Sequence, residues 1–482
     1  MRSLAALLCL VSACSLAQTQ KPASEPTARM RQIITSYTDD KSFMGTVFVI
    51  KDGNTLIDQG YGSADLEWNI SNSPTTKFRL GSITKQFTAA SILLLQDRGK
   101  LSIDDPVSKY MPDAPAAWSK ITIYNVLTHT SGIPNFTGFP DYRSTEWKDT
   151  NPTELVARFR NKPLEFEPGT KFNYSNSGYV LLGYLIEKIS GQTYADFLQQ
   201  NIFTPLGMTS TGIDSNVAIL PQRAQGYHRT PRGIEHDGYI SMTIPFSAGA
   251  LYSTTGDLLK WEQGLFGGKV LKPESLAKMT TPFKGAYGCG LFIRTIDGHK
   301  LITHGGGIEG FNTSLNFYPD DKLTVIVLGN LAGGAPDMIA SSLGKVALGQ
   351  QVILPSERKT IDVSPALLAE YAGTYRMTDA PIDNIIAIKD GHLTSKLANQ
   401  PTVDLFAESE TKFFLKVVDA QVEFSGIRDP RHQSPGPQSG RRAARRQKTI
   451  ILLKQSGRPI QGGHSASAKI TAGRMSAAGS SF

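Results

Sequence analysis

The pattern of apolar and polar positions changes from strand-like to helical within the first hundred residues. Met44 to Lys51 alternate between the two kinds, Asp52-Gly53 is a turn signal, and Thr55 to Gln59 continue as a second short strand. From Ser82 to Asp97 apolar residues recur at helical spacing and also fill most of the positions between. The sequence therefore predicts a hairpin followed by a helix that is buried on nearly every side.

The middle of the chain predicts further helices and then a group of strands. Helical spacing occurs in three segments: Asn151 to Arg160, Gly178 to Ser190 and Asp257 to Leu265. Three strand patterns follow: Lys300 to His304, Thr313 to Tyr318 and Leu323 to Leu328. Strands at both ends with helices between them indicate an α+β fold, in which helices flank an antiparallel sheet completed by the first and last segments.

The pattern changes again after Gly349, where the segments become short and strand-like. A polar stretch, Pro355 to Lys359, predicts a linker over 353–366. We predict a small β-barrel or meander over 367–474, interrupted by a loop at 427–448. Its expected strands are Tyr371 to Tyr375, Ile385 to Lys389, His392 to Lys396, Lys412 to Val417, Gln421 to Phe424 and Thr449 to Lys454.

Length and composition are consistent with an exported globular chain of two domains. The 482 residues are 40% hydrophobic and 19% charged, a globular balance. Arg2, the apolar stretch Leu4 to Val11 and small residues up to Ala17 predict a signal peptide over 1–17, and hence a periplasmic or extracellular location. Val11 to Cys14 also resembles a lipobox, so cleavage after Ala17 and a lipid anchor at Cys14 both stay open. No later run approaches the ~20 apolar residues of a membrane span.

The net charge of +8 is concentrated in the loop at 427–448, which has seven Lys or Arg against one acid, or +6. The favoured interpretation is a disordered insertion, with binding to a nucleic acid or an anionic surface as the alternative. We expect no nucleic-acid partner. Outside the signal region the chain has one cysteine, Cys289, so no intramolecular disulfide is expected and this residue is predicted to be a small packed strand residue.

The first candidate for chemistry is a hydroxyl and an amine at i and i+3, in Ser82-Ile83-Thr84-Lys85. Gly81 allows a tight turn into the helix, so Ser82 lies in the first turn, where the helix dipole and free N–H groups favour negative charge. A free lysine has a pKa near ~10.4, so burial has to lower the pKa of Lys85 before it can accept a proton. The spacing alone is common, and it needs support from elsewhere in the chain.

A second motif, Tyr174-Ser175-Asn176, lies in a polar loop before the helix at 178–190. The phenol of Tyr174 could relay a proton, and the amide of Asn176 could hold a substrate carbonyl or the lysine. The alternative is a loop tyrosine packed on the core, with Asn176 as a local helix cap. The loop Leu127 to Pro134 contains His129, which we interpret as a structural residue.

A third motif is glycine-rich: His304-Gly305-Gly306-Gly307 is predicted to end a strand. Glycines leave room for a substrate backbone at this point. The N–H of Gly307, together with that of Ser82, could form an oxyanion hole, and losing one such donor typically costs about 10²–10³ in rate. The alternative is a glycine-rich hairpin corner with an incidental histidine.

Together the three motifs resemble the serine β-lactamase and penicillin-binding protein superfamily, whose signature is S-x-x-K, Y-x-N or S-x-N, and K-T-G or a variant. Leu127 to Pro134 and Gly307 to Phe311 also look like loops of its class C-like branch. The resemblance covers roughly residues 30 to 349. It implies a β-lactamase/transpeptidase-like domain over 30–352 with an all-helical lobe, and Tyr371 to Tyr375 resembles the start of a lipocalin-like appendix.

The resemblance also implies a role for each motif residue. The expected roles are Ser82 as nucleophile, Lys85 as acylation base, Tyr174 as proton relay, Asn176, His304 and Gly306 as substrate contacts, and Ser82 with Gly307 as the oxyanion hole. Class C β-lactamases have lysine in the third motif. The histidine variant found here is similar to the third motif of D-alanyl-D-alanine carboxypeptidases, D-aminopeptidases and some family VIII esterases. With an ordinary pKa near ~6.5, His304 offers a substrate carboxylate less attraction than lysine would.

The sequence therefore predicts a serine hydrolase that forms an acyl-enzyme on Ser82 and cleaves amide or ester bonds in D-amino-acid peptides, β-lactams or small esters. A family VIII-type carboxylesterase and a non-catalytic penicillin-binding protein are the alternatives. No cofactor is expected, and without H-E-x-x-H or a Cys/His cluster no metal site is expected either. The absence of G-x-S-x-G leaves an α/β-hydrolase unsupported. The oligomeric state stays open.

Overall fold

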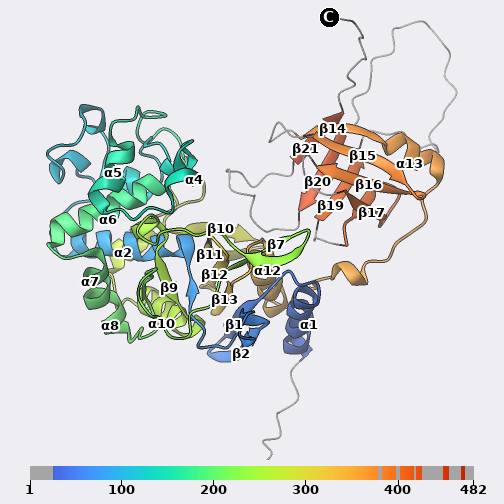
Figure 1. The fold of residues 1–482 in the computed structure, drawn as a ribbon, viewed down its shortest axis with the longest axis horizontal. Coiled ribbons are helices and arrows are strands. Elements are labelled where there is room, and N and C mark those ends of the chain that lie inside the picture. Colours follow the sequence, from blue (N-terminus) through green and yellow to red (C-terminus); the bar gives the residue numbers. More distant parts are fainter. Residues whose placement is uncertain are drawn as a thin grey trace, which may run out of the picture.

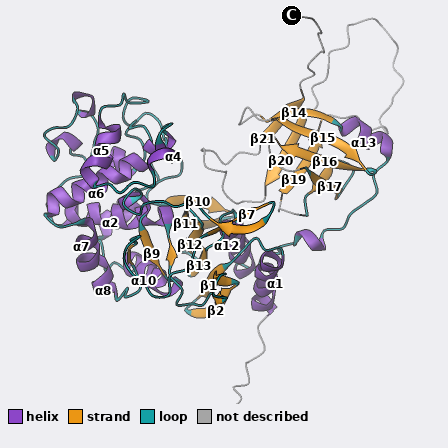
Figure 2. Cartoon of the chain, viewed as in Figure 1, coloured by secondary structure: helices purple, strands orange, loops and turns teal. Residues whose placement is uncertain are grey.

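The computed structural model describes residues 25–377, 383–397, 402–416, 420–425, 449–454 and 468–472. A part built of helices around a sheet comes first along the chain, and a barrel of strands follows it (Figures 1 and 2). The predicted signal peptide at 1–17, with Cys14, and the basic loop at 427–448 lie outside the described residues.

The central sheet is antiparallel and has the order β10-β11-β12-β13-β1-β2. The first strand, β1, pairs with the last, β13, from Gly45 opposite Gly329 to Lys51 opposite Leu323. The predicted α+β fold, with a sheet completed by the first and last segments, is confirmed. Its strands are β1 (Gly45–Lys51), β2 (Asn54–Tyr61), β10 (Phe292–Ile296), β11 (His299–Ile308), β12 (Phe311–Tyr318) and β13 (Leu323–Gly329).

Alternation along β1 divides its side chains between two hydrophobic cores. Val47 and Val49 belong to a core closed by α1 (Glu25–Asp39) and α12 (Ala335–Ala347). Phe48 belongs to the larger core on the other face, which also takes in α10 (Thr255–Phe266). Because successive side chains of a strand point to opposite faces, this strand is buried on both.

The remaining helices of this part form a lobe beside the sheet (Figure 1). The predicted buried helix is α2, which packs against α6 and α9 and has Phe87, Ile92 and Leu93 fully buried. The helices are α2 (Thr84–Asp97), α3 (Ile123–Leu127), α4 (Tyr142–Thr145), α5 (Pro152–Arg160), α6 (Asn176–Ser190), α7 (Tyr194–Leu198), α8 (Thr204–Leu206), α9 (Phe246–Gly249) and α11 (Pro273–Met279), with 3-10 turns at Gly81–Ile83, Val107–Lys109, Ala116–Trp118 and Phe136–Gly138 and a π-helical segment at Gln199–Phe203. Another 3-10 turn, Pro355–Glu357, lies in the polar stretch that follows this part.

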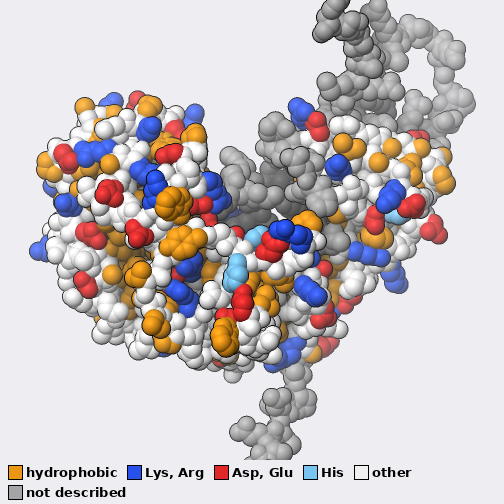
Figure 3. All heavy atoms as spheres, viewed as in Figure 1, with side chains coloured by type: hydrophobic (Ala, Val, Ile, Leu, Met, Phe, Trp, Pro, Cys, Tyr) orange, Lys and Arg blue, Asp and Glu red, His pale blue; other side chains and the backbone are white. Residues whose placement is uncertain are grey.

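Smaller sheets also occur in the first part of the chain. They are β3 (Ser63–Asp65) with β4 (Ile70–Ser71), β5 (Phe78–Arg79) with β9 (Leu251–Ser253) and β6 (Gly212–Ile213), and β7 (Tyr227–Thr230) with β8 (Gly233–His236). On the face shown in Figure 3, Lys or Arg and Asp or Glu side chains are interspersed over this part of the molecule.

Two local predictions in the first part were wrong. The strand predicted to end at His304 continues to Ile308, because Gly305, Gly306 and Gly307 pair with residues of β12. Cys289 is buried but lies in a bend before β10 rather than in a strand, and Gly290 beside it has a φ of +75°, outside the extended region. Burial raises the pKa of the Cys289 thiol to about 12, so it stays protonated at neutral pH.

The C-terminal part is a closed antiparallel barrel in which the strands follow one another in chain order, and β14 pairs with β21 to close it. This confirms the predicted small β-barrel. Its strands are β14 (Gly373–Met377), β15 (Asp383–Lys389), β16 (His392–Leu397), β17 (Val403–Ala407), β18 (Lys412–Phe414), β19 (Ala420–Ser425), β20 (Thr449–Lys454) and β21 (Ala468–Ala472). The strands β17 and β21 were not predicted from the sequence.

The strand predicted from Tyr371 was also wrong at its start. Residues Pro365–Tyr371 form the helix α13, and the strand begins only at Gly373. Ser364 caps this helix through its side chain, which accepts a hydrogen bond from the Leu367 amide, and proline at the first helical position supplies a suitable φ.

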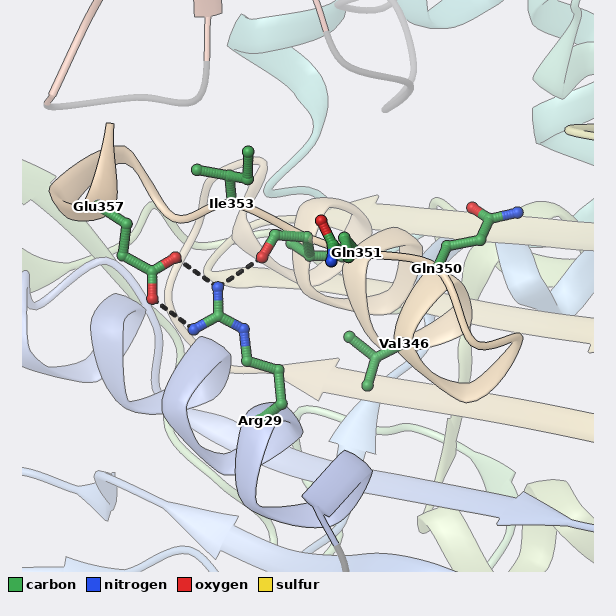
Figure 4. Close-up of a pocket in the computed structure, with 7 residues that line it drawn as sticks. Arg29, Val346, Gln350, Gln351, Ile353 and Glu357 are labelled. Atoms are coloured by element: carbon green, nitrogen blue, oxygen red, sulfur yellow. Dashed lines mark hydrogen bonds and ion pairs between the residues drawn. The ribbon is translucent and has the colours of Figure 1, made fainter. Parts of the chain in front are cut away.

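The polar stretch between the two parts is attached to the first helix. The Arg29 guanidinium donates hydrogen bonds to the Glu357 carboxylate and to the Val352 carbonyl (Figure 4). Hydrogen bonding to Arg29 lowers the pKa of Glu357 to about 2. The start of the predicted linker is therefore fixed against α1.

A buried carboxyl group in α10 predicts a pH-dependent stability. Glu262 is 3% exposed beneath β13, and burial raises its pKa to about 8 although a hydrogen bond with Thr324 opposes the shift. Since its pKa in the folded state lies above the ordinary value of 4.5, the folded protein binds the extra proton between these limits. We expect the free energy of unfolding to fall by about 3 kcal/mol from pH 5 to pH 8 through this group.

Chemical denaturation of Glu262→Gln at both pH values measures this contribution. The neutral amide should remove that part of the slope and make the variant more stable than the parent protein at pH 8. Glu274→Gln, on the exposed surface of α11, is the matched control and should keep the parent slope. Equal slopes in the parent and in Glu262→Gln would contradict the prediction.

Candidate active site

Ser82 lies in a 3-10 turn, Gly81–Ile83, directly before α2 and is half-buried. Gly81 has a φ of +54°, and a Cβ on it would stand 2.8 Å from the Gly307 nitrogen. Glycine is required here both for the left-handed backbone and for the close approach of β11. The turn therefore places Ser82 beside the glycine-rich strand.

Lys85 is fully buried one turn later, and its ammonium contacts three separate segments of the chain. Its Nζ donates to the Ser82 Oγ at 3.0 Å, to the Asn176 Oδ1 at 2.8 Å and to the Ala248 carbonyl at 2.7 Å. An ammonium has three donors, and these three oxygens use all of them. The nucleophile predicted from the sequence thus lies within hydrogen-bonding distance of its predicted base.

Tyr174 lies beside the same ammonium. The Lys85 Nζ is 4.9 Å from the centroid of the Tyr174 ring and 5.6 Å from that of Tyr179 on α6. The Tyr174 ring is in turn 6.3 Å from the His304 imidazole, measured between centroids. The fold therefore brings the phenol of the second motif between the first motif and the third.

The amide of Asn176 is occupied on both sides. Its Oδ1 accepts from Lys85, its Nδ2 donates to the Thr137 Oγ at 3.2 Å, and its backbone N–H donates to the Asn135 side chain at 3.0 Å. Of the two roles that the sequence left open for this amide, this structure has the contact with Lys85. The helix α6 begins at Asn176, two residues earlier than predicted.

The third motif presents mainly backbone atoms, rather than its histidine side chain, to a substrate. His304 is 1% exposed, with its Nε2 3.1 Å from the Tyr287 hydroxyl and its Nδ1 2.6 Å from the Gly305 carbonyl oxygen. A Cβ on Gly306 would lie 1.8 Å from the Leu80 carbonyl oxygen, so only glycine fits, and Gly307 is exposed. A substrate would reach the Gly307 backbone more readily than the His304 ring.

Several neighbours of the site were not recognised in the sequence. Ala248 contributes through its carbonyl, which no side-chain pattern reveals; the run of small residues Ser247 to Ala250 was the available signal for a close approach. Tyr287 and Thr137 contact motif residues but belong to no motif. His129, interpreted as structural, packs on Tyr174 with ring centroids 4.3 Å apart.

A serine whose hydroxyl contacts a buried lysine, next to a glycine-lined strand edge, is typical of serine hydrolases that use a lysine base. Residues 30–345 match the family model described as Beta-lactamase, and the chain belongs to this family. Family membership and the relatives described next support serine hydrolase activity.

Three comparisons illustrate the relationship. A penicillin-binding protein of Bacillus subtilis is 29% identical over 410 residues, which are 80% of this chain and 90% of that protein. The structure of an octameric penicillin-binding protein homologue from Pyrococcus abyssi matches with a TM-score of 0.61 and 25% identity, over 92% of this chain and 99% of that one. A D-stereospecific amidohydrolase from Streptomyces matches with a TM-score of 0.58 and 26% identity, over 66% and 97%.

In the part of the chain that the structure describes, no helix combines the length and the apolar character needed to cross a membrane. The same residues contain no group of three or more His, Cys, Asp or Glu side chains arranged to hold a metal ion.

Proposed function

We propose that this chain hydrolyses amides or esters through a covalent acyl-enzyme on Ser82. The observation that carries the proposal is the 3.0 Å contact between the Nζ of the fully buried Lys85 and the Oγ of the half-buried Ser82. A lysine must be neutral to act as a base, and burial away from water favours the neutral form.

In the proposed acylation, Lys85 accepts the hydroxyl proton while the Ser82 Oγ bonds to the substrate carbonyl carbon. The electron pair of the C=O bond moves to oxygen, beside the backbone N–H groups of Ser82 and Gly307. When the tetrahedral intermediate collapses, the bond to the leaving group breaks, and the leaving group takes a proton through Tyr174. Water then attacks the Ser82 ester by the same route, releasing the acid and restoring the hydroxyl.

For the substrate, we propose a D-amino-acid peptide or amide, with small esters as the second candidate and β-lactams as the third. Support comes from the neighbour named as a D-stereospecific amidohydrolase. The third motif has a buried histidine where class C β-lactamases have lysine, which favours the first two classes over β-lactams. The lysine–serine contact favours catalysis over a purely penicillin-binding role.

Values of kcat/KM for nitrocefin, a D-Ala-D-Ala peptide and a short-chain p-nitrophenyl ester test the substrate class. We expect nitrocefin to be at least ~10-fold poorer than the better of the other two, because a hydrogen bond to a charged lysine is worth roughly 1.5–3 kcal/mol and is missing here. Nitrocefin as the best of the three would contradict this order.

We further propose that the protein is exported by way of residues 1–17. The mass of the mature N-terminus from the native host decides between cleavage after Ala17 and a lipidated Cys14. An N-terminus that still begins at Met1 would overturn export by this route.

A further inference from the structure

His129 makes a hydrogen bond on each side of Tyr174. It follows α3, and its backbone carbonyl accepts from the Asn173 N–H at 2.9 Å. Its Nδ1 accepts from the Ser175 N–H at 3.1 Å. One residue, 44 and 46 positions away in sequence from its two partners, therefore holds the backbone amides of the residues on either side of Tyr174.

The imidazole also packs against the ring that it positions. His129 is 1% exposed, and its ring lies 4.3 Å from the Tyr174 ring, 4.9 Å from Tyr179 and 4.7 Å from Tyr287, measured between centroids. Two of these rings, Tyr174 and Tyr179, also lie beside the Lys85 ammonium. A shift of the His129 ring would be transmitted directly to Tyr174.

The backbone of His129 is unusual as well. Its φ is +56°, in the left-handed region, where histidine and asparagine are tolerated better than most residues and branched side chains are not. This conformation allows the carbonyl and the side chain of one residue to reach two amides in the same loop. A residue at position 129 therefore has to tolerate a left-handed backbone and also has to offer a side-chain hydrogen-bond acceptor.

The hydrogen bond to Ser175 also specifies the proton on the ring. Because Nδ1 accepts, it carries no hydrogen, so the neutral imidazole is protonated at Nε2. Among the described residues Nε2 has no hydrogen-bond partner, so the hydrogen bond from the Ser175 amide and the packing of the three tyrosine rings orient the imidazole. Burial and the nearby Lys85 charge lower the pKa of His129 well below its usual value, and the other titratable groups facing it are the phenols of Tyr174, Tyr179 and Tyr287.

We propose that His129 is a positioning residue that holds the Tyr174 phenol beside Lys85 by accepting hydrogen bonds from the amides on both sides of it. The inference rests on the proposed function, since it assigns a role to Tyr174 in proton transfer. Misplacement of a reacting group by about 1 Å can cost ~10² in rate, so small movements of this loop matter.

His129→Asn and His129→Leu test the proposal as a pair. The asparagine Oδ1 occupies the place of Nδ1 and tolerates the backbone, whereas leucine is of similar size but lacks the acceptor. We expect kcat of His129→Asn within ~10-fold of the parent, and kcat of His129→Leu lower by ~10², with KM changed less than ~3-fold in both. If His129→Leu does not fold, His129→Gly replaces it, because glycine accepts the left-handed φ and also lacks the acceptor.

Two further measurements separate this inference from the function on which it rests. In a Tyr174→Phe background the difference between the two His129 variants should vanish, because the loss acts through the missing phenol. Equal kcat values for folded His129→Asn and His129→Leu would overturn the positioning role while leaving the Ser82 chemistry intact. Turnover that survives Ser82→Ala would instead overturn the proposed function itself.

Discussion

Replacing Ser82 with alanine is expected to abolish turnover, with kcat falling by about 10⁴-fold or more. The reason is covalent: without Oγ no acyl-enzyme can form, and the Lys85 amine has no hydroxyl to deprotonate. The same variant should no longer be labelled by a fluorophosphonate or a fluorescent penicillin. The measurements are intact-protein mass spectrometry after labelling and kcat on the best of the three test substrates: nitrocefin, the D-Ala-D-Ala peptide and the p-nitrophenyl ester.

The fold should survive this change. The Ser82 Oγ contributes one of the three acceptors for Lys85, and the Asn176 and Ala248 oxygens remain. Ser119→Ala is the matched control, because Ser119 is an exposed serine in the helical lobe, remote in sequence from every motif residue. It should keep full activity and full labelling. Retained turnover or labelling in folded Ser82→Ala would reject the mechanism.

Replacing Lys85 with methionine is expected to lower kcat by about 10³-fold with little change in KM. Methionine has a similar length but no basic nitrogen, so the hydroxyl of Ser82 stays protonated and is a poor nucleophile. The variant should lose much more of its acylation rate than of its substrate affinity. Stopped-flow measurement of the pre-steady-state burst separates the acylation rate from substrate binding.

The stability of this variant needs a separate measurement. Removing the ammonium leaves the Asn176 Oδ1 and the Ala248 carbonyl without their partner, at roughly 1–3 kcal/mol each, but it also removes a buried charge. Activity is therefore compared at equal folded fraction. Lys100→Met, on the exposed surface just after α2, is the control and should behave as the parent. An unchanged kcat in folded Lys85→Met would show that another group takes the serine proton.

Much of the architecture was predictable because it depends on local patterns. Strand alternation identified the hairpin of β1 and β2, and helical spacing identified α2, α5, α6 and α10 to within about two residues. The predictions that were wrong have two different causes. The β11 strand continues past His304 because the distant strand β12 lies opposite its glycines. The error at Tyr371 is local, because Ser364 and the proline after it are a helix start signal that the strand prediction overlooked.

The candidate site also has a part that the sequence predicts and a part that only the tertiary structure shows. The contact between Ser82 and Lys85 follows from spacing within a single turn, and sequence alone suffices for it because neighbouring residues have few other arrangements. The acceptors that complete the lysine site, Asn176 and Ala248, are 91 and 163 residues away, and only the packing of α6 and α9 against α2 brings them there. The role inferred for His129 depends on hydrogen bonds from two backbone amides. No side-chain pattern in the sequence indicates these bonds, because they exist only in the folded loop.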